Sequence, residues 1–420
     1  MSTQEIVSGE RSEGEKRRHS FEFSASIKKT EMKNALTFSL VLTILTQSYS
    51  QNIYENLSNE LLEQFKNSEL TGFAVSIVKA DSILYKKGFG FENIETKNEF
   101  TIEKRFYIAS ISKTFIGIGL MKLVEDGKLE LSTPINSILP FQVVNPKYPN
   151  SEITIEQLAR HTSTILNGDL GSKSWYLDEE FSLKKKEIGK TAYSDFKNWA
   201  HNSKITLGEF LKESLSYNGK LYSEKNFSNK KPGDQYQYSN LGAALASYII
   251  ELKTGIEYDK YIENFVTTEL NFEPGVWRHI PDNELPTTYF QTKVQTPNHR
   301  PILYPTGGMM LSCNELTLYL QEMIKGFNGN SQLLNSDSFQ EMMSAKEDTQ
   351  NPGGIFWELK GNKIGHNGGN YGVTCFMSFD KNTGIGKIFM TNISSYTDNE
   401  LLKEMVAIWN KLSEYESKFE

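Results

Sequence analysis

Apolar residues recur along this chain with two different spacings, and the spacing predicts the kind of element. Short apolar runs near both ends are typical of strands, whereas longer amphipathic stretches indicate helices. We expect strands over 72–79, 82–88, 355–360, 362–366, 371–379 and 385–392. We expect helices over 53–68, from 110 to about 126, and over 241–253, 313–325 and 398–417.

The order of these elements predicts the fold class. A two-residue turn, Ala80-Asp81, joins the strands 72–79 and 82–88, which implies antiparallel pairing. Strands near both ends with helices between them predict an α+β protein: one mostly antiparallel sheet formed from both chain ends and flanked by helices. The inserted all-helical region would cover about 128–350, and a cleft would form where this region meets the sheet.

The first fifty residues are expected to lie outside the folded domain. Residues 1–31 are polar and charged, which indicates disorder or a mis-called extension before a true start at Met32. Residues 32–50 have a basic start, a short apolar core and small residues before Gln51, the pattern of a secretory signal peptide. An uncut N-terminal anchor is the alternative, although the core is too short to span a membrane. We expect residues 51–420 to form one exported domain, periplasmic or extracellular.

Charge and cysteine content narrow the function classes. The formal net charge is −7 and basic residues do not cluster in the folded part, so we expect no nucleic-acid partner. The six histidines are scattered and none has metal-ligand spacing with a cysteine, so we expect no metal and no other cofactor. The two cysteines, Cys313 and Cys375, would pair in an exported protein or remain as buried thiols, and the sequence leaves both open.

The first candidate for chemistry is a serine and a lysine three residues apart, Ser110 and Lys113, at the start of an apolar helical run. This spacing places both side chains on one helix face, and the positive end of the helix lies where negative charge would develop on the serine oxygen. A partly buried lysine loses its proton more easily than in water and can activate the hydroxyl. The spacing alone is common by chance, so the motif needs support from elsewhere.

Two later motifs supply that support. Tyr238 and Asn240 flank a serine on the turn before the helix 241–253. A phenol beside a lysine could exist partly as phenolate and take a proton from Ser110, and an asparagine offers a donor and an acceptor to a substrate amide. Residues 365–372 form a glycine-rich stretch between two expected strands, where a ligand can approach the backbone closely. Taken alone, Tyr238 reads as a turn residue that packs on the helix.

The three motifs in this order resemble the serine beta-lactamase and penicillin-binding-protein superfamily, nearest its class C branch with the related esterases and D-amino-acid peptidases. The resemblance covers about 60–415. It is supported by Ile153 to Ser163, by Pro232-Gly233 and by Pro305 to Gly308.

The resemblance implies a role for each position. Ser110 would be the acylated nucleophile, Lys113 and Tyr238 would share general-base and general-acid duty, and the N–H groups of Ser110 and Gly369 would form the oxyanion hole. The substrate-binding residues would be Asn240, His366, Asn367 and Gly368.

This sequence departs from the family pattern at two places. Thr164-Ile165 follows the His161 motif where Gly-Leu is usual, which leaves the geometry of that turn in doubt. His366 stands where beta-lactamases and transpeptidases usually carry lysine. Because histidine is mostly neutral at pH 7, a substrate carboxylate would lose its cationic partner. Esters or amides are then favoured over beta-lactams, although His366 can also be read as a purely structural residue.

These observations predict an exported serine hydrolase that forms an acyl-enzyme on Ser110, acting on a small ester or a D-amino-acid amide or peptide. A class C-like beta-lactamase or a D-Ala-D-Ala carboxypeptidase is the alternative within the family. A non-catalytic protein that binds cell-wall fragments is the alternative of another class. Its mark would be the loss of the serine, lysine or tyrosine, and all three are present. The expected partner is a small-molecule or peptide substrate, and the oligomeric state stays open.

Overall fold

The computed structural model describes residues 51–273, 275, 277, 285–290, 293–346, 353–395 and 398–419. The expected N-terminal extension 1–31 and signal peptide 32–50 lie outside these residues. The chain divides into two units, residues 1–60 with 419 and residues 61–418 with 420, and the account below concerns the second. A helix covers 51–66, close to the expected 53–68. Among the described residues, no helix is long and apolar enough to cross a membrane.

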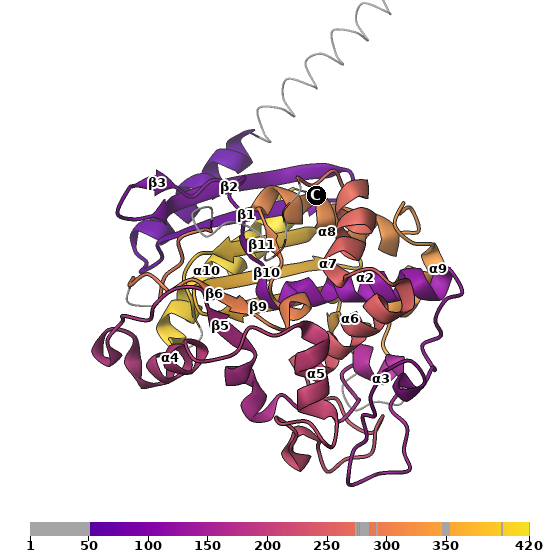
Figure 1. The fold of residues 1–420 in the computed structure, drawn as a ribbon. Coiled ribbons are helices and arrows are strands. Elements are labelled where there is room, and N and C mark those ends of the chain that lie inside the picture. Colours follow the sequence, from indigo (N-terminus) through magenta and orange to yellow (C-terminus); the bar gives the residue numbers. More distant parts are fainter. Residues whose placement is uncertain are drawn as a thin grey trace, which may run out of the picture. The chain divides into compact units, whose positions relative to one another are not determined.

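A seven-stranded antiparallel sheet is built from both parts of the chain that were expected to supply it, in the order β3-β2-β1-β11-β10-β9-β8. The N-terminal β1 pairs with the C-terminal β11, so the purple and yellow ends of the chain lie side by side in Figure 1. The strands are β1 Gly72–Lys79, β2 Ser82–Asn93, β3 Asn98–Glu99, β8 Glu358–Lys360, β9 Lys363–Asn370, β10 Val373–Asp380 and β11 Gly386–Thr391. The predicted α+β class is confirmed.

Two strand boundaries differ from the prediction. Strand β8 begins at Glu358 rather than 355, because the N–H groups of Ile355 and Phe356 bond to the carbonyls of Met342 and Ala159 instead of to the sheet. Strand β9 continues to Asn370, so the glycine-rich segment lies on a strand rather than between two strands. Pairing with β10 carries the strand through these glycines, since partner strands supply what glycine propensity lacks.

Helices lie on both faces of the sheet. Helix α8 packs against β1 and β11. On the opposite face of the sheet, Trp409 of α10 packs against Phe376 of β10. The ammonium of Lys387, on β11, lies 4.4 Å from the centroid of the Trp409 ring. The helices are α2 Ser112–Glu125, α3 Ile155–Ala159, α4 Lys185–Trp199, α5 Leu207–Leu215, α6 Asn240–Thr254, α7 Tyr258–Ile262, α8 Cys313–Phe327, α9 Ser336–Met342 and α10 Asn399–Glu416.

The expected insertion, about 128–350, is not all-helical. Helices are its main regular structure, but they alternate with loops, and it also contains short strands. Strand β5 (Trp175–Leu177) pairs with β6 (His299–Pro301), and β7 (Met310–Leu311) pairs with β4 (Phe106–Tyr107), which lies before the insertion. These runs of two or three residues are too short for their sequence pattern to be told from that of a loop.

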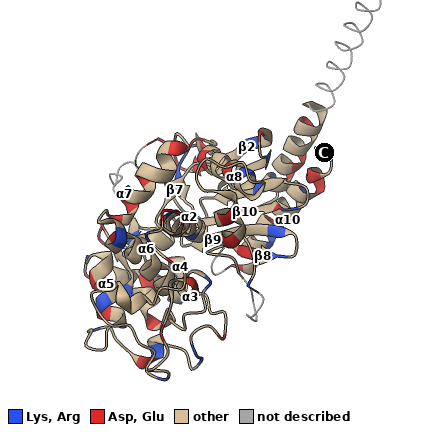
Figure 2. Ribbon diagram, turned by 90° about the vertical axis from the view of Figure 1, so that its right-hand side faces the viewer, with Lys and Arg blue, Asp and Glu red and all other residues tan. Residues whose placement is uncertain are grey.

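Acidic and basic residues are interspersed along the ribbon in the view of Figure 2.

Local sequence signals set the ends of the helices that carry the site. Ser239 caps α6 by accepting the N–H of Gly242, and Gly255 ends that helix at a positive φ of 70°. A capping box between Ser312 and Glu315 opens α8 at Cys313, the expected start of this helix. The sequence therefore determined where these helices begin and end.

Both cysteines are free and buried, so the structure supports the buried-thiol alternative. Burial raises the pKa of the Cys313 thiol to about 12. A thiol with this pKa is unreactive near neutral pH, because the thiolate is the reactive form.

Candidate active site

Ser110 and Lys113 lie together as predicted, but on a tighter turn than an α-helix. Ser110 is in the 3-10 turn Ala109–Ile111, and the α-helix begins two residues later at Ser112. Ala109 has a positive φ of 45°, which breaks the helical path before the serine and stores strain there. Lys113 Nζ lies 3.0 Å from Ser110 Oγ and donates to the Thr306 carbonyl at 2.7 Å.

Burial shifts the pKa values of the two candidate acid–base groups, Lys113 and Tyr238, in opposite directions. Lys113 is fully buried, and this desolvation lowers its pKa well below the usual 10.5. Burial raises the pKa of Tyr238 well above 10, and its hydrogen bond to Ser110 only partly offsets that. The Lys113 ammonium position is 5.0 Å from the centroid of the Tyr238 ring. These shifts favour a neutral lysine and a protonated phenol over the phenolate that the sequence suggested.

His161 lies directly behind Tyr238, and the sequence analysis had given it no role. The centroids of the two rings are 4.6 Å apart. His161 Nδ1 accepts the N–H of Ser239 at 3.2 Å, which ties the ring to the Tyr238 turn. Burial, with a smaller contribution from Lys113, lowers the pKa of His161 well below 6.5. A neutral ring here supports Tyr238 without adding charge next to the lysine.

Asn240 occupies the first turn of α6 and lines the same cavity as Ser110. Its side-chain Oδ1 is buried and has no hydrogen-bond partner among the described residues. A buried acceptor left open in this way suits a donor on a bound ligand. Its backbone N–H donates to Asn167 Oδ1 at 2.8 Å, so Asn167, which the sequence analysis missed, holds the helix start in place.

The turn that departs from the family pattern keeps a left-handed conformation. Thr164, at the position where glycine was expected, has a φ of 71°. A β-branched residue in that region is strained by roughly 1–2 kcal/mol. Its hydroxyl accepts from Asn145 at 3.0 Å and its carbonyl accepts from Ser228 at 2.8 Å, which holds the turn. The doubt about this loop is therefore resolved by tertiary contacts.

Two neighbouring glycines of β9 have opposite surroundings. A Cβ on Gly368 would lie 2.4 Å from the Ile108 carbonyl oxygen and 3.1 Å from Ser110 N, so only glycine lets the strand approach the serine turn. A Cβ on Gly369 would meet nothing within 4 Å, and Gly369 lines the Ser110 cavity. Strand β9 thus packs against the Ser110 turn at Gly368 and leaves open space at Gly369.

The Ser110 cavity has a volume of about 300 Å³. It brings together Ser110, Asn240 and Gly369, while Lys113 and Tyr238 reach Ser110 from the buried side. His366 and Asn367 instead line a separate cavity of about 210 Å³ with Glu358 and Trp409. The residues around the Ser110 cavity are Ala109, Ser110, Gly171, Ser172, Ser174, Trp175, Asp195, Trp199, Asn240, Pro301, Leu303, Thr306, Gly307, Gly369, Asn370 and Tyr371.

His366 is almost fully buried at 3% exposure, and its Nδ1 lies 2.7 Å from the Asn367 carbonyl. Desolvation, then the nearby Lys113, lowers its pKa to about 4. The ring is therefore neutral at pH 7, as the sequence suggested. It is not among the described residues that line the Ser110 cavity, but it lies near Tyr238, Lys113 and His161, and a charge on its ring would act on the site through them.

Buried neutral histidines should make the protein unstable in acid. Burial lowers the pKa of His299 and of His366 to about 4, whereas an unfolded histidine titrates near 6.5. Between those values the unfolded chain binds more protons than the folded chain. The contribution of these histidines to the free energy of unfolding is therefore full above about pH 6.5 and falls as the pH drops toward 4. Each histidine contributes up to about 3 kcal/mol to this loss.

Urea denaturation at several pH values between 7.5 and 4 measures the effect. His299→Gln should make the loss shallower, and His201→Gln, at an exposed ring, should leave it unchanged. A free energy of unfolding that stays constant down to pH 4.5 would contradict the assignment.

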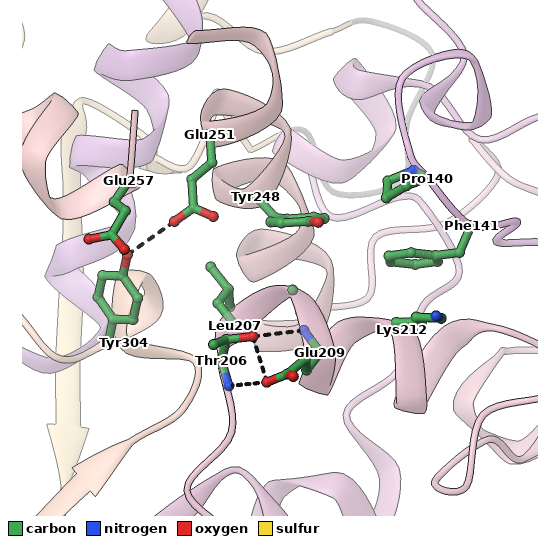
Figure 3. A pocket seen from close by; sticks show the side chains of 11 residues that line it. Pro140, Phe141, Thr206, Leu207, Glu209, Lys212, Tyr248, Glu251, Glu257 and Tyr304 are labelled. Atoms are coloured by element: carbon green, nitrogen blue, oxygen red, sulfur yellow. Dashed lines mark hydrogen bonds between the residues drawn. The ribbon is translucent and has the colours of Figure 1, made fainter. Parts of the chain in front are cut away.

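A third cavity, of about 330 Å³, lies beside α5 and α6 (Figure 3) and shares no residue with the Ser110 cavity. Two of its three carboxylates are already engaged: Glu251 accepts from the Tyr304 hydroxyl at 3.2 Å, and Glu209 caps α5 through Thr206. These contacts stabilise the fold around the cavity. No group of three or more possible metal ligands occurs within the part of the chain that the structure describes.

The fold and the Ser110 site define a class, the serine hydrolases with a beta-lactamase-type fold. The family model named Beta-lactamase matches residues 59–407, and the chain belongs to this family.

Similar curated proteins include Protein flp of Staphylococcus aureus strain N315, 26% identical over 222 residues, which are 53% of this chain and 37% of that protein. The human mitochondrial serine beta-lactamase-like protein LACTB is 22% identical over 66% of this chain and 59% of its own length. The chain thus spans only part of the length of these relatives.

Solved structures with the same fold include the octameric penicillin-binding protein homologue from Pyrococcus abyssi. Its TM-score is 0.65 at 22% identity, over 86% of this chain and 77% of that chain. A D-stereospecific amidohydrolase from Streptomyces has a TM-score of 0.57 at 18% identity, over 84% of this chain and 97% of its own. At these identities the likeness concerns the fold alone.

Proposed function

We propose that this protein is a serine hydrolase that forms an acyl-enzyme on Ser110. The observation that carries the proposal is the fully buried Lys113, whose Nζ lies 3.0 Å from Ser110 Oγ. No ion pair to Lys113 is found among the described residues, so a buried charge there would have only neutral neighbours such as the Thr306 carbonyl and no carboxylate partner. A neutral amine at hydrogen-bond distance from a hydroxyl can act as the general base that takes its proton.

In the proposed acylation, the Ser110 proton moves to Lys113 Nζ while Ser110 Oγ forms a bond to the substrate carbonyl carbon. The N–H groups of Ser110 and Gly369 would stabilise the oxyanion. Tyr238 would then donate its phenolic proton to the leaving group as the carbonyl re-forms, and Lys113 would return its proton to Tyr238. Water would release the acyl group by the reverse proton route.

Small esters or D-amino-acid amides and peptides are the proposed substrates. No lysine or arginine is among the described residues that line the Ser110 cavity, and His366 is neutral and lies outside that lining. A carboxylate-bearing beta-lactam would thus lack a cationic partner. A class C-like beta-lactamase or a carboxypeptidase remains the alternative reaction on the same residues. A non-catalytic binding protein is the alternative that the intact Ser110–Lys113–Tyr238 set disfavours.

The test combines labelling with a substrate panel. A fluorophosphonate probe should label the protein, and tandem mass mapping should place the adduct on Ser110. Ser112 should stay unlabelled, because its hydroxyl is buried and donates to the Ala109 carbonyl at 2.7 Å. A short-chain nitrophenyl ester should be hydrolysed faster than nitrocefin. Absence of labelling together with no turnover on any ester, amide or beta-lactam would favour the binding-protein alternative.

A further inference from the structure

We propose that the Ser110 cavity selects substrates with a protonated amine near the scissile carbonyl, and that Asp195 with Trp175 and Trp199 recognises the ammonium. The substrate class would be amino-acyl esters and amides with a free amino group. This inference rests on the proposed hydrolase function and specifies what the same site accepts.

Asp195 gives the cavity its charge. It is the single acidic or basic residue among the described residues that line the cavity. Its Oδ2 accepts the Tyr371 hydroxyl at 2.8 Å, and within the described part of the chain no basic side chain forms an ion pair with it. A carboxylate that faces a cavity without a cation of its own attracts a cationic ligand.

Two tryptophans form the aromatic part of the same wall. Trp175 of β5 and Trp199 of α4 both line the cavity, and their stacked rings have centroids 5.2 Å apart. Trp199 is 4% exposed, and its Nε1 has no hydrogen-bond partner among the described residues. Indole faces attract ammonium groups, and this attraction strengthens when water is excluded. Trp199 is covered by its neighbours, so the partly exposed Trp175 would supply the contact surface for the ammonium and Trp199 would support it.

The basic groups nearest this wall are buried and form no ion pair with Asp195 in the described part of the chain, and burial lowers the pKa of each. His299 packs against both tryptophans at centroid distances of 5.3 Å. Its burial lowers its pKa to about 4. Lys113, behind Ser110, has a pKa well below 10.5 for the same reason. The cavity is thus an acidic one that would repel the carboxylate of a beta-lactam.

The wall is rigid, which fixes the carboxylate near the reacting serine. Asp195 and Trp199 are four residues apart on α4 and share a helix face. Between them, Phe196 is fully buried and packs against Trp199 and Tyr371 at centroid distances of 4.8 and 5.2 Å. Tyr371 directly follows β9, the strand that carries Gly369, so the groups around the ammonium and those around the oxyanion share one support.

The experiment compares benzyl esters of alanine in both configurations, N-acetylalanine and propionic acid. These differ mainly in the ammonium. We expect wild-type kcat/KM to be at least tenfold higher for one alanine ester than for its uncharged analogues, the size of effect that a partly buried charge contact gives. Asp195→Asn should remove about tenfold of this preference and leave the propionic ester within threefold of wild type. Asp169→Asn, which removes an exposed carboxylate outside the cavity, is the matched control.

The outcomes separate the two proposals. Equal turnover of the alanine and propionic esters, unaltered by Asp195→Asn, would overturn the amine subsite while the hydrolase stands. If no ester is hydrolysed and Ser110 is not labelled, the hydrolase proposal fails, and calorimetric binding of alaninamide against propionamide then tests the subsite alone. Binding of alaninamide that Asp195→Asn abolishes supports the subsite, and equal binding of both amides overturns it. If Asp195→Asn lowers the Tm by several degrees, Asp195→Ser makes the same comparisons.

Discussion

Ser110→Ala is expected to lower kcat/KM on the preferred ester by roughly 10⁴–10⁶-fold and to abolish fluorophosphonate labelling. Without the hydroxyl no acyl-enzyme forms, and the oxyanion donors with the cavity can only assist direct attack by water. Ser110 is partly exposed and contacts Lys113 and Tyr238, so the substitution removes the reacting atom and little packing. Thermal unfolding should show a fold as stable as the wild type.

Ser172→Ala is the matched control for this substitution, because Ser172 lines the same cavity and its hydroxyl donates only to the Asp169 carbonyl, at 3.2 Å. It should retain kcat/KM within severalfold. Labelling that persists in Ser110→Ala would place the nucleophile elsewhere and remove the basis of the proposed function.

Lys113→Met and Tyr238→Phe are each expected to slow acylation by about 10²–10⁴-fold, the usual contribution of a placed acid or base. Methionine fills the space of the lysine without an amine, and phenylalanine keeps the ring that packs on His161. Because Lys113 and Tyr238 act in one proton relay, the double variant should lose much less than the product of the two single losses. Pre-steady-state release of nitrophenol measures the acylation rate.

The pH profile distinguishes the lysine from a phenolate as the base. Acylation needs neutral Lys113, so the rate should rise with pH through the lysine pKa, which burial places well below 10.5, and then stay level. Tyr238 keeps its proton in that range, because burial raises its pKa well above 10. A rate that starts to rise only above pH 10, or fully multiplicative losses in the double variant, would mean that the two groups act differently from the proposal.

The sequence by itself determined the class of fold and the proximity of Ser110 and Lys113. The apolar runs at both ends predicted the strands of a single antiparallel sheet, and the expected helix end near 126 and helix start at 313 agree with the ends of α2 and α8. The three-residue spacing also brought Ser110 and Lys113 into contact. These features are local: they follow from side-chain periodicity, caps and glycine positions, which a short stretch of sequence specifies.

The protonation states and the lining of the cavity were decided only by the tertiary structure. Whether Lys113 or Tyr238 loses its proton depends on burial by segments far away in the sequence, among them the Thr306 carbonyl. Asp195 and Trp199 lie on α4, in a polar stretch whose pattern gave neither residue a role, and they reach the Ser110 cavity because Phe196 anchors that helix. His366 was assigned to the cleft from its place in a motif, but it is buried beside Tyr238, with ring centroids 6.3 Å apart, and is not among the described residues that line the Ser110 cavity. Desolvation and the facing of side chains are properties of packed surfaces, and no local stretch of sequence encodes them.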